Sequence, residues 1–264
     1  MNAAPRPRKR FGQHFLACDD TIARIVAAIA PRAGDTLVEI GPGRAALTAP
    51  LANLATDLGI ELHAIEFDRD LVPKLRQQFA SYRNIVIHEA DALRFDFASL
   101  GPTLRIVGNL PYNISTPLLF HLIDARGSIR DMHLMLQKEV VDRLAADPCS
   151  RAFGRLTVMA GAFLHAERLF DVPPTAFRPP PRVVSTVLRL VPRRDDALHI
   201  DDPAFLREVV TQAFSQRRKT LHNALKRVAT ADDFAALGIA PRARPEELPV
   251  ATWVALSNYL HARR

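Results

Sequence analysis

The stretch Thr36-Leu37-Val38-Glu39-Ile40-Gly41-Pro42-Gly43 places a short apolar run directly before a turn that contains two glycines. The residues that follow, Arg44-Ala45-Ala46, open a helical pattern. Glycine lets the backbone approach a bound molecule closely, and the first turn of a helix offers N–H groups without partners. This order of strand, glycine turn and helix predicts one unit of a parallel sheet, with a ligand outside the carboxyl end of the strand.

Strand and helix patterns alternate on both sides of this unit. Before it, apolar residues between Ile22 and Ile29 recur at helical spacing until Pro31 ends the pattern. The β-branched run 183–191, entered through a proline-rich passage at 173–181, predicts a closing strand. Such alternation is typical of an α/β fold with helices on both faces of a parallel sheet. Strands are predicted at 36–40, 62–65, 85–87, 104–107 and 132–136, and helices at 45–54, 70–79, 116–123 and 138–146.

A second, smaller domain is expected after the sheet. Beyond Asp201 the strand signal disappears, and the bridge Pro192–Asp196 is charged and poor in apolar residues, as linkers between domains are. We therefore expect an α/β domain over residues 1–194 and a small all-helical domain over residues 195–264. Its helices are predicted at 205–214, 220–228, 234–237 and 252–260.

The composition excludes several classes of protein. A chain of 264 residues with 48% hydrophobic and 24% charged residues is globular rather than disordered. Its two cysteines, Cys18 and Cys149, suit neither a disulfide framework nor a cysteine zinc site, and we expect no metal. No apolar run approaches the roughly 20 residues that cross a bilayer, and the basic N-terminus lacks the apolar part of a signal peptide. We therefore expect a cytoplasmic protein with no membrane partner.

The net charge of +7 favours a polyanionic partner such as a nucleic acid. The basic residues that suggest this gather in three runs along the chain. They are Arg6, Arg8, Lys9 and Arg10, then Arg178, Arg182, Arg189, Arg193 and Arg194, and then Arg217, Arg218 and Lys219.

Acidic side chains stand where the second and third predicted strands end. Glu66 follows roughly 20 residues after Gly43, where a carboxylate can accept hydrogen bonds from both hydroxyls of a ribose. Asp91 ends the third strand and can accept a hydrogen bond from an adenine amino group. These positions predict a nucleoside cofactor. A nicotinamide cofactor stays open here, because Gly41-x-Gly43-x-x-Ala46 with a distal acid also suits an oxidoreductase.

The string Asn109-Leu110-Pro111-Tyr112-Asn113 ends the fourth strand and is the most informative in the chain. An exocyclic amine on an aromatic base is a poor nucleophile, because its lone pair is delocalised into the ring. The amide oxygen of Asn109 and the carbonyl of Leu110 can accept its two N–H bonds and favour a tetrahedral nitrogen. Pro111 stiffens the turn, and Tyr112 offers a ring on which the base can stack.

These strings, with Arg10-Phe11-Gly12-Gln13-His14-Phe15-Leu16 near the N-terminus, closely resemble the ribosomal RNA adenine dimethyltransferases. The likeness covers Arg8 to Leu225 and is greatest to the bacterial small-subunit branch. It implies a Rossmann-like S-adenosylmethionine-dependent methyltransferase fold with S-adenosylmethionine as cofactor. It also implies dimethylation of two adjacent adenines near the 3′ end of 16S ribosomal RNA. Further matching strings are Leu136–Val140, Val172–Phe177, Pro179–Pro181 and Phe214–Thr220.

The resemblance also implies a role for each site residue. Asn109, Leu110, Pro111 and Tyr112 would form the catalytic turn, with Tyr112 and Phe177 sandwiching the extruded base. Two positions depart from the family pattern, since His14 replaces an asparagine found in many relatives and Ala46 replaces a third glycine. The residues implied to bind the cofactor are Gln13, His14, Leu16, Gly41, Gly43, Glu66, Asp91 and Asn109.

The partner implied is 16S ribosomal RNA within the immature small subunit, and we expect the protein itself to be monomeric. Arg217, Arg218 and Lys219 are predicted to begin a helix and to hold RNA phosphates. Two alternatives keep the fold. One is a noncatalytic ribosome-assembly factor that binds RNA, against which the intact Asn109–Tyr112 string argues. The other is an adenine methylase of large-subunit RNA, against which the helical tail argues.

Overall fold

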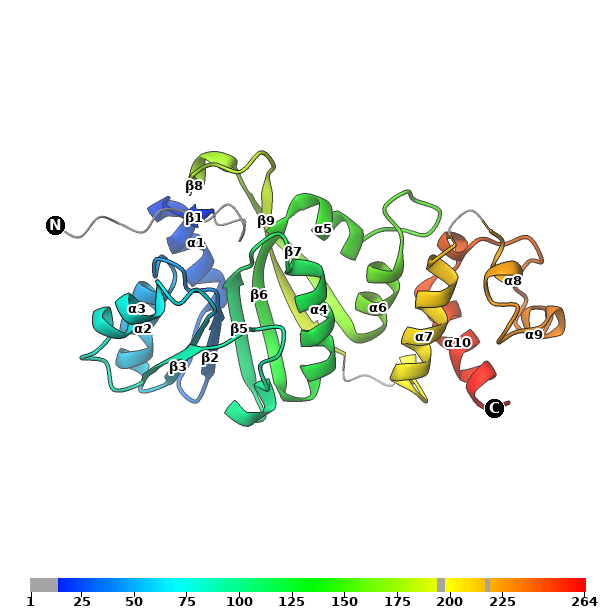
Figure 1. Ribbon diagram of the computed structural model, residues 1–264, viewed down its shortest axis with the longest axis horizontal. Coiled ribbons are helices and arrows are strands. Elements are labelled where there is room, and N and C mark those ends of the chain that lie inside the picture. Colours follow the sequence, from blue (N-terminus) through cyan, green and yellow to red (C-terminus); the bar gives the residue numbers. More distant parts are fainter. Residues whose placement is uncertain (1–13, 194–197, 217–218) are drawn as a thin grey trace. The chain divides into compact units, whose positions relative to one another are not determined.

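The computed structural model describes residues 14–193, 198–216 and 219–264, and a seven-stranded sheet forms its centre (Figure 1). The sheet strands are, in their order across the sheet, β4 Ile85–Glu89, β3 Glu61–Glu66, β2 Thr36–Ile40, β5 Leu104–Asn109, β6 Ile129–Gln137, β9 Ser185–Pro192 and β7 Leu164–Val172. The strands from β4 to β6 run parallel, and β9 pairs antiparallel with β6. A separate ribbon pairs β1 (Phe15–Leu16) with β8 (Phe177–Arg178). The predicted α/β, Rossmann-like class is confirmed.

The strand order reverses between β2 and β5. The chain runs outward from β2 through β3 to β4 and then returns to the other side of β2 as β5. The carboxyl ends of β2, β3 and β5 therefore meet where the connections diverge, which is the place where such sheets bind ligands. Gly108 keeps β5 close to β2, because a Cβ there would lie 2.8 Å from the carbonyl oxygen of Ile40.

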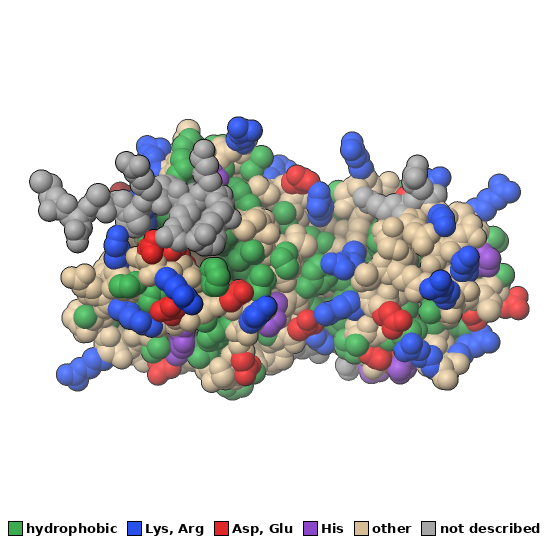
Figure 2. Space-filling model, viewed as in Figure 1, with side chains coloured by type: hydrophobic (Ala, Val, Ile, Leu, Met, Phe, Trp, Pro, Cys, Tyr) green, Lys and Arg blue, Asp and Glu red, His purple; other side chains and the backbone are tan. Residues whose placement is uncertain are grey.

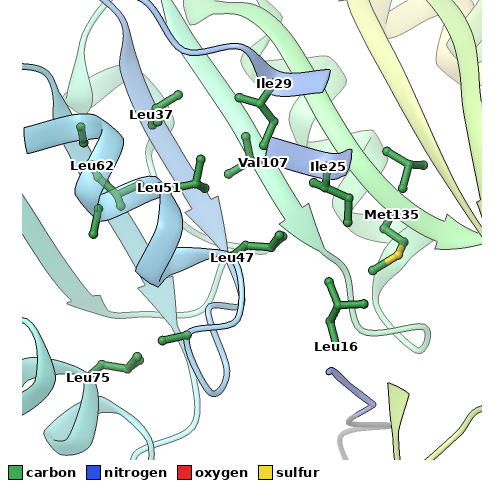
Figure 3. Packing of buried hydrophobic residues seen from close by; sticks show 14 of the residues in the cluster. Leu16, Ile25, Ile29, Leu37, Leu47, Leu51, Leu62, Leu75, Val107 and Met135 are labelled. Atoms are coloured by element: carbon green, nitrogen blue, oxygen red, sulfur yellow. The ribbon is translucent and has the colours of Figure 1, made fainter. Parts of the chain in front are cut away.

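One face of the sheet carries the main apolar cluster (Figure 3). Leu37, Leu62 and Val107 contribute from the strands, and Leu51 and Ile29 pack on them from two helices. Burying each such side chain contributes about 1.5–3 kcal/mol, so this cluster fixes the strand ends that form the site. The helices of this part of the chain are α1 Asp19–Ile29, α2 Thr48–Leu58, α3 Val72–Gln78, α4 Ser115–Asp124 and α5 Lys138–Leu144.

A buried charge network joins the carboxyl end of α1 to the amino ends of β5 and β6. The Arg105 guanidinium donates to Asp35 at 2.7 Å and to Asp131 at 2.9 Å. It also donates to the carbonyl oxygen of Ile29 at 2.7 Å, one of the last carbonyls of α1, which have no partner within the helix. Asp35 and Asp131 are both nearly inaccessible, so removing Arg105 would leave two buried carboxylates without this partner.

The prediction misses three features between Thr36 and Val172. Helix α2 begins at Thr48 rather than near Ala45, because Ala45 takes a left-handed conformation (φ 65°) that a helix cannot contain. Helix α6 (Arg155–Phe163) and strand β7 go unpredicted. Most β7 side chains are exposed or half-buried, so its sequence lacks the apolar signal of the central strands.

The described chain divides into two compact units. The sheet unit comprises residues up to Val141 with Glu167–Pro192, and the helical unit comprises Asp142–Ala166 with the residues from Arg193 onward. The helical unit therefore takes in a segment that the expected division at residue 194 gives to the first domain. The division into domains 1–194 and 195–264 stays a prediction.

The helical unit has an aromatic centre of its own. The Trp253 side chain is fully buried, and its ring lies 5.5 Å from that of Phe214, which in turn lies 6.4 Å from that of Phe153.

Helix α8 is shorter than predicted. None of the helices in the described residues has the length and apolar character needed to cross a membrane. Besides α6, the helices of this unit are α7 Pro203–Phe214, α8 Leu221–Ala224, α9 Ala231–Ala236 and α10 Val250–His261.

Candidate active site

A cavity of about 340 Å³ opens at the carboxyl ends of β2, β3 and β5. This volume lies within the usual range for small-molecule sites. The structure brings most of the predicted site residues to the cavity wall, although they come from segments far apart in the sequence. The predicted residues that line it are His14, Leu16, Gly41, Gly43, Glu66, Asp91, Asn109, Leu110, Pro111 and Tyr112.

The glycine loop after β2 owes its shape to left-handed backbone conformations. Gly41 and Gly43 have φ angles of 73° and 59°, which glycine adopts without steric cost. A Cβ at Gly43 would also lie 3.2 Å from the ring of Phe15, so this position is closed to larger residues from one side. The guanidinium of Arg44 lies over the same Phe15 ring, 4.4 Å from its centroid. The loop is therefore packed against Phe15, which lies between His14 and Leu16, two of the residues predicted to bind the cofactor.

Glu66 ties the glycine loop to the end of β3. Its Oε2 accepts a hydrogen bond from the Gly43 N–H at 3.0 Å, and its Oε1 accepts one from the Asp68 N–H at 2.8 Å. Burial raises the pKa of Glu66, while these backbone N–H groups oppose the rise. Each carboxylate oxygen has a second lone pair, so both can still accept a hydroxyl donor.

Glu39, on β2, lines the cavity and was not among the predicted site residues. Its side chain is almost inaccessible, and its Oε2 has no hydrogen-bond partner within the described residues. Burial raises the pKa of Glu39 from its ordinary value of 4.5 to about 7, against the opposing effect of the Thr48 hydroxyl. Neighbouring Glu66 raises this pKa as well. An acid among the apolar residues of a central strand was the signal available in the sequence.

Asp91 follows β4 and lies half-buried on the cavity wall. Its Oδ1 accepts a hydrogen bond from the Leu93 N–H at 3.0 Å, and its carbonyl oxygen accepts one from the Arg94 N–H at 2.9 Å. These bonds form a turn that holds the carboxylate at the strand end.

The side-chain amide of Asn109 is held in place through its nitrogen. Its Nδ2 donates to the carbonyl oxygen of His14 at 3.2 Å, whereas its Oδ1 accepts no hydrogen bond from the described part of the chain. The Leu110 N–H donates to the Met135 carbonyl oxygen at 3.2 Å, which anchors the turn to β6. The fixed amide therefore presents an acceptor to the cavity that a donor on a ligand can use.

Tyr112 is fixed at its hydroxyl and on one ring face. The hydroxyl shares a 2.8 Å hydrogen bond with the Ser185 hydroxyl, and the ring of His14 stacks on it with centroids 5.5 Å apart. His14 in turn places its Nδ1 2.8 Å from the Pro179 carbonyl oxygen. The ring contact joins two predicted site residues, His14 and Tyr112. Their spacing in the sequence does not predict this contact.

Some predicted site residues lie elsewhere or outside the described residues. Phe177 is fully buried in the main apolar cluster and does not line the cavity, so its stacking role stays a prediction. Lys219 is exposed, but it precedes Thr220, the N-cap of α8, so the prediction that it begins a helix is wrong. Gln13, Arg217 and Arg218 lie outside the described residues.

The sheet order and the cavity at its switch point are those of a Rossmann-like methyltransferase. A solved dimethyladenosine transferase from Plasmodium falciparum has a similar structure, with a TM-score of 0.77 and 25% identity over 92% of this chain and 96% of that one. The 23S rRNA methyltransferase ErmE shares the fold, with a TM-score of 0.70 and 24% identity over 94% of this chain and 99% of that one.

Comparison at the sequence level specifies the family. The profile of the family described as ribosomal RNA adenine dimethylase matches residues 5–262. A ribosomal RNA small subunit methyltransferase A from Thiobacillus denitrificans is 53% identical over 97% of this chain and 99% of its own length. A protein of the same name from Aromatoleum aromaticum is 52% identical over 98% of this chain and 96% of its own length. The chain belongs to the ribosomal RNA adenine dimethylase family, and it is an enzyme that transfers methyl groups rather than an oxidoreductase.

Proposed function

We propose that this enzyme transfers methyl groups from S-adenosylmethionine to the N6 atoms of two adjacent adenines near the 3′ end of 16S ribosomal RNA. The substrate is the RNA within the immature small subunit, and the protein acts in the cytoplasm as a monomer. The observation that carries the proposal is the amide oxygen of Asn109, which accepts no hydrogen bond from the described residues and belongs to a side chain on the wall of a nucleoside-sized cavity. The small-subunit names of the relatives support this substrate over large-subunit RNA.

The residues present fit S-adenosylmethionine. The Glu66 carboxylate would hold the ribose hydroxyls, Asp91 the adenine amino group, and the backbone around Gly41 and Gly43 the methionine end. Buried Glu39, whose Oε2 has no hydrogen-bond partner among the described residues, supplies a further acceptor next to this loop. When bound, the cofactor supplies a methyl group on a positively charged sulfur, which is an activated donor without a metal.

The work of the chain's own residues is to present the adenine amine. The Asn109 Oδ1 and the Leu110 carbonyl accept its two N–H bonds, which turns the nitrogen lone pair outward and raises its nucleophilicity. Tyr112 stacks on the extruded base, its ring held by Ser185 and His14. Positioning and exclusion of water supply most of the rate enhancement in such a site. The proton released on methylation leaves to water, so no residue has to act as a strong base.

RNA binding outside the cavity falls to basic residues. We propose that Lys219, exposed in the helical unit, binds RNA phosphates together with Arg217 and Arg218. We also propose that Phe177 stacks on the base opposite Tyr112 once its side chain is uncovered. This requires a local rearrangement, because Phe177 packs in the core of the free protein.

The experiment that tests the proposal is methylation of immature small subunits with isotopically labelled S-adenosylmethionine, followed by mass spectrometry of the RNA. The expected product is a pair of adjacent N6-dimethyladenines near the 3′ end of 16S RNA. The Asn109→Ala variant serves as the control for transfer at this site. Particle binding without incorporated label would favour an assembly factor, and label in large-subunit RNA alone would favour the large-subunit alternative.

A further inference from the structure

The segment Arg178–Val184, here called the β8–β9 lip, is held at both ends by residues that line the cavity. Near its start, the Nδ1 of His14 lies 2.8 Å from the Pro179 carbonyl oxygen. Directly after its end, Ser185 shares the 2.8 Å hydrogen bond with the Tyr112 hydroxyl. The lip is therefore fixed beside the ring on which the target base is proposed to stack.

The β8–β9 lip exposes apolar side chains at this place. Val183 and Val184 are 43% and 36% exposed. Within the described residues, the other large hydrophobic side chains with comparable exposure are Phe67 and Val86, and Phe67 also lines the cavity. Val183 and Val184 directly precede Ser185, whose hydroxyl bonds that of Tyr112 on the cavity wall. Single exposed apolar residues are ordinary, but two in succession beside a ligand site favour a contact surface.

The same segment carries two arginines that have no carboxylate partner among the described residues. Arg178 and Arg182 are exposed, and neither forms an ion pair with any described residue. Arg168, in contrast, donates to Asp171 at 2.7 Å. Figure 2 shows hydrophobic and basic side chains close together over the top of the sheet unit, where Figure 1 places the loop between β8 and β9. Uncompensated guanidinium groups beside apolar side chains match a strand of nucleic acid, which offers phosphates and base faces.

We propose that the β8–β9 lip binds the RNA nucleotides next to the target adenine. Extruding one base leaves its neighbours without a stacking partner, and apolar side chains can cover their exposed faces. Val183 and Val184 take this place, while Arg178 and Arg182 bind the adjoining phosphates. The proposal rests on the proposed function and adds to it a second RNA-contacting surface, on the sheet unit itself.

Two pairs of single variants test this inference. Val183→Ser is compared with Val86→Ser, because Val86 is 42% exposed on the edge strand β4, at a distance along the sheet from β9. Arg182→Gln is compared with Arg83→Gln, because Arg83 is also exposed and also lacks an ion pair within the described residues. Affinity for a 16S RNA fragment that contains the target adenines is measured across a salt series. Cofactor affinity and thermal midpoint are measured for all four variants.

Val183→Ser is expected to weaken RNA binding at least threefold with an unchanged salt dependence. Arg182→Gln is expected to lower the slope of log affinity against log salt by about 0.7, the effect of one contact to single-stranded phosphate. Both control variants should have the RNA affinity of the parent. All four variants should have its cofactor affinity. Lip variants that bind RNA like their controls would overturn the inference. So would weaker binding to small subunits with unchanged binding to free RNA, since that indicates a protein partner. A parent protein that neither binds nor methylates the RNA would instead refute the proposed function.

Discussion

Replacing Gly108 by alanine should disturb the site through the backbone alone. The added Cβ would lie 2.8 Å from the Ile40 carbonyl oxygen and 3.0 Å from the Leu110 Cδ2, so β5 has to move away from β2. Forcing extra volume into such a packed place costs about 1–3 kcal/mol of unfolding free energy. Asn109 is the next residue and moves with the strand. Because a misplacement of about 1 Å can slow a reaction about 100-fold, we expect methyl transfer to slow by about tenfold or more.

The matched control for this variant is Gly127→Ala. A Cβ at Gly127 meets nothing within 4 Å, so its unfolding free energy should stay within about 0.5 kcal/mol of the parent. Urea denaturation followed by far-ultraviolet circular dichroism measures stability, while fluorescence of Trp253, the single tryptophan, monitors the helical unit separately. Single-turnover methylation measures the rate. Equal stability and equal rate for the two alanine variants would refute the close approach of β5 to β2.

Four further predictions concern single groups. Glu66→Ala should weaken cofactor binding by about 1–3 kcal/mol in calorimetry and leave RNA affinity unchanged, since a charged hydrogen-bond acceptor is lost. The pKa of Glu39 lies above its ordinary 4.5, so its contribution to stability is present below about pH 4.5 and is lost as the pH rises through 7. Glu39→Gln should therefore flatten the profile of unfolding free energy against pH between about pH 4.5 and 7. Phe177→Ala should lower the free energy of unfolding by about 3–5 kcal/mol because its ring is fully buried, and a change in methylation rate alone would mean that the ring does not pack in the core. The double change Arg217→Ala with Lys219→Ala should flatten the salt dependence of RNA binding by up to about 0.7 per lost phosphate contact, whereas an unchanged slope with lower thermal stability would assign these cations to the fold.

The sequence predicts the parallel strands and most of the cavity wall because both depend on local patterns. An apolar run before Gly41, an acid at Glu66 and the string after Asn109 each identify a strand end, and all parallel strands end at one edge. The features it misses depend on contacts between distant residues. Arg105 meets Asp35 across 70 positions, and no periodicity marks such a pair.

Burial explains the remaining differences. Phe177 follows prolines in a loop-like passage, which suggests exposure, yet pairing of β8 with β1 places it opposite Leu16 in the core. Strand β7 has largely exposed side chains and therefore reads as a loop. Because Ala45 is left-handed, α2 begins only at Thr48. Helix propensity alone does not show where the turn between strand and helix ends.

The rate of a single methyl transfer by Asn109→Ala, measured at saturating S-adenosylmethionine, tests most directly whether the site presents an adenine amine. Saturation separates transfer from any loss of cofactor affinity. The Oδ1 of Asn109 accepts no hydrogen bond from the described residues and is a preorganised acceptor, and losing such a group slows the chemical step on the order of 100-fold. We predict that Asn109→Ala lowers the transfer rate by about this factor. Its affinity for RNA should equal that of the parent. A variant that transfers the methyl group at the rate of the parent would contradict the assignment of this cavity as the catalytic site.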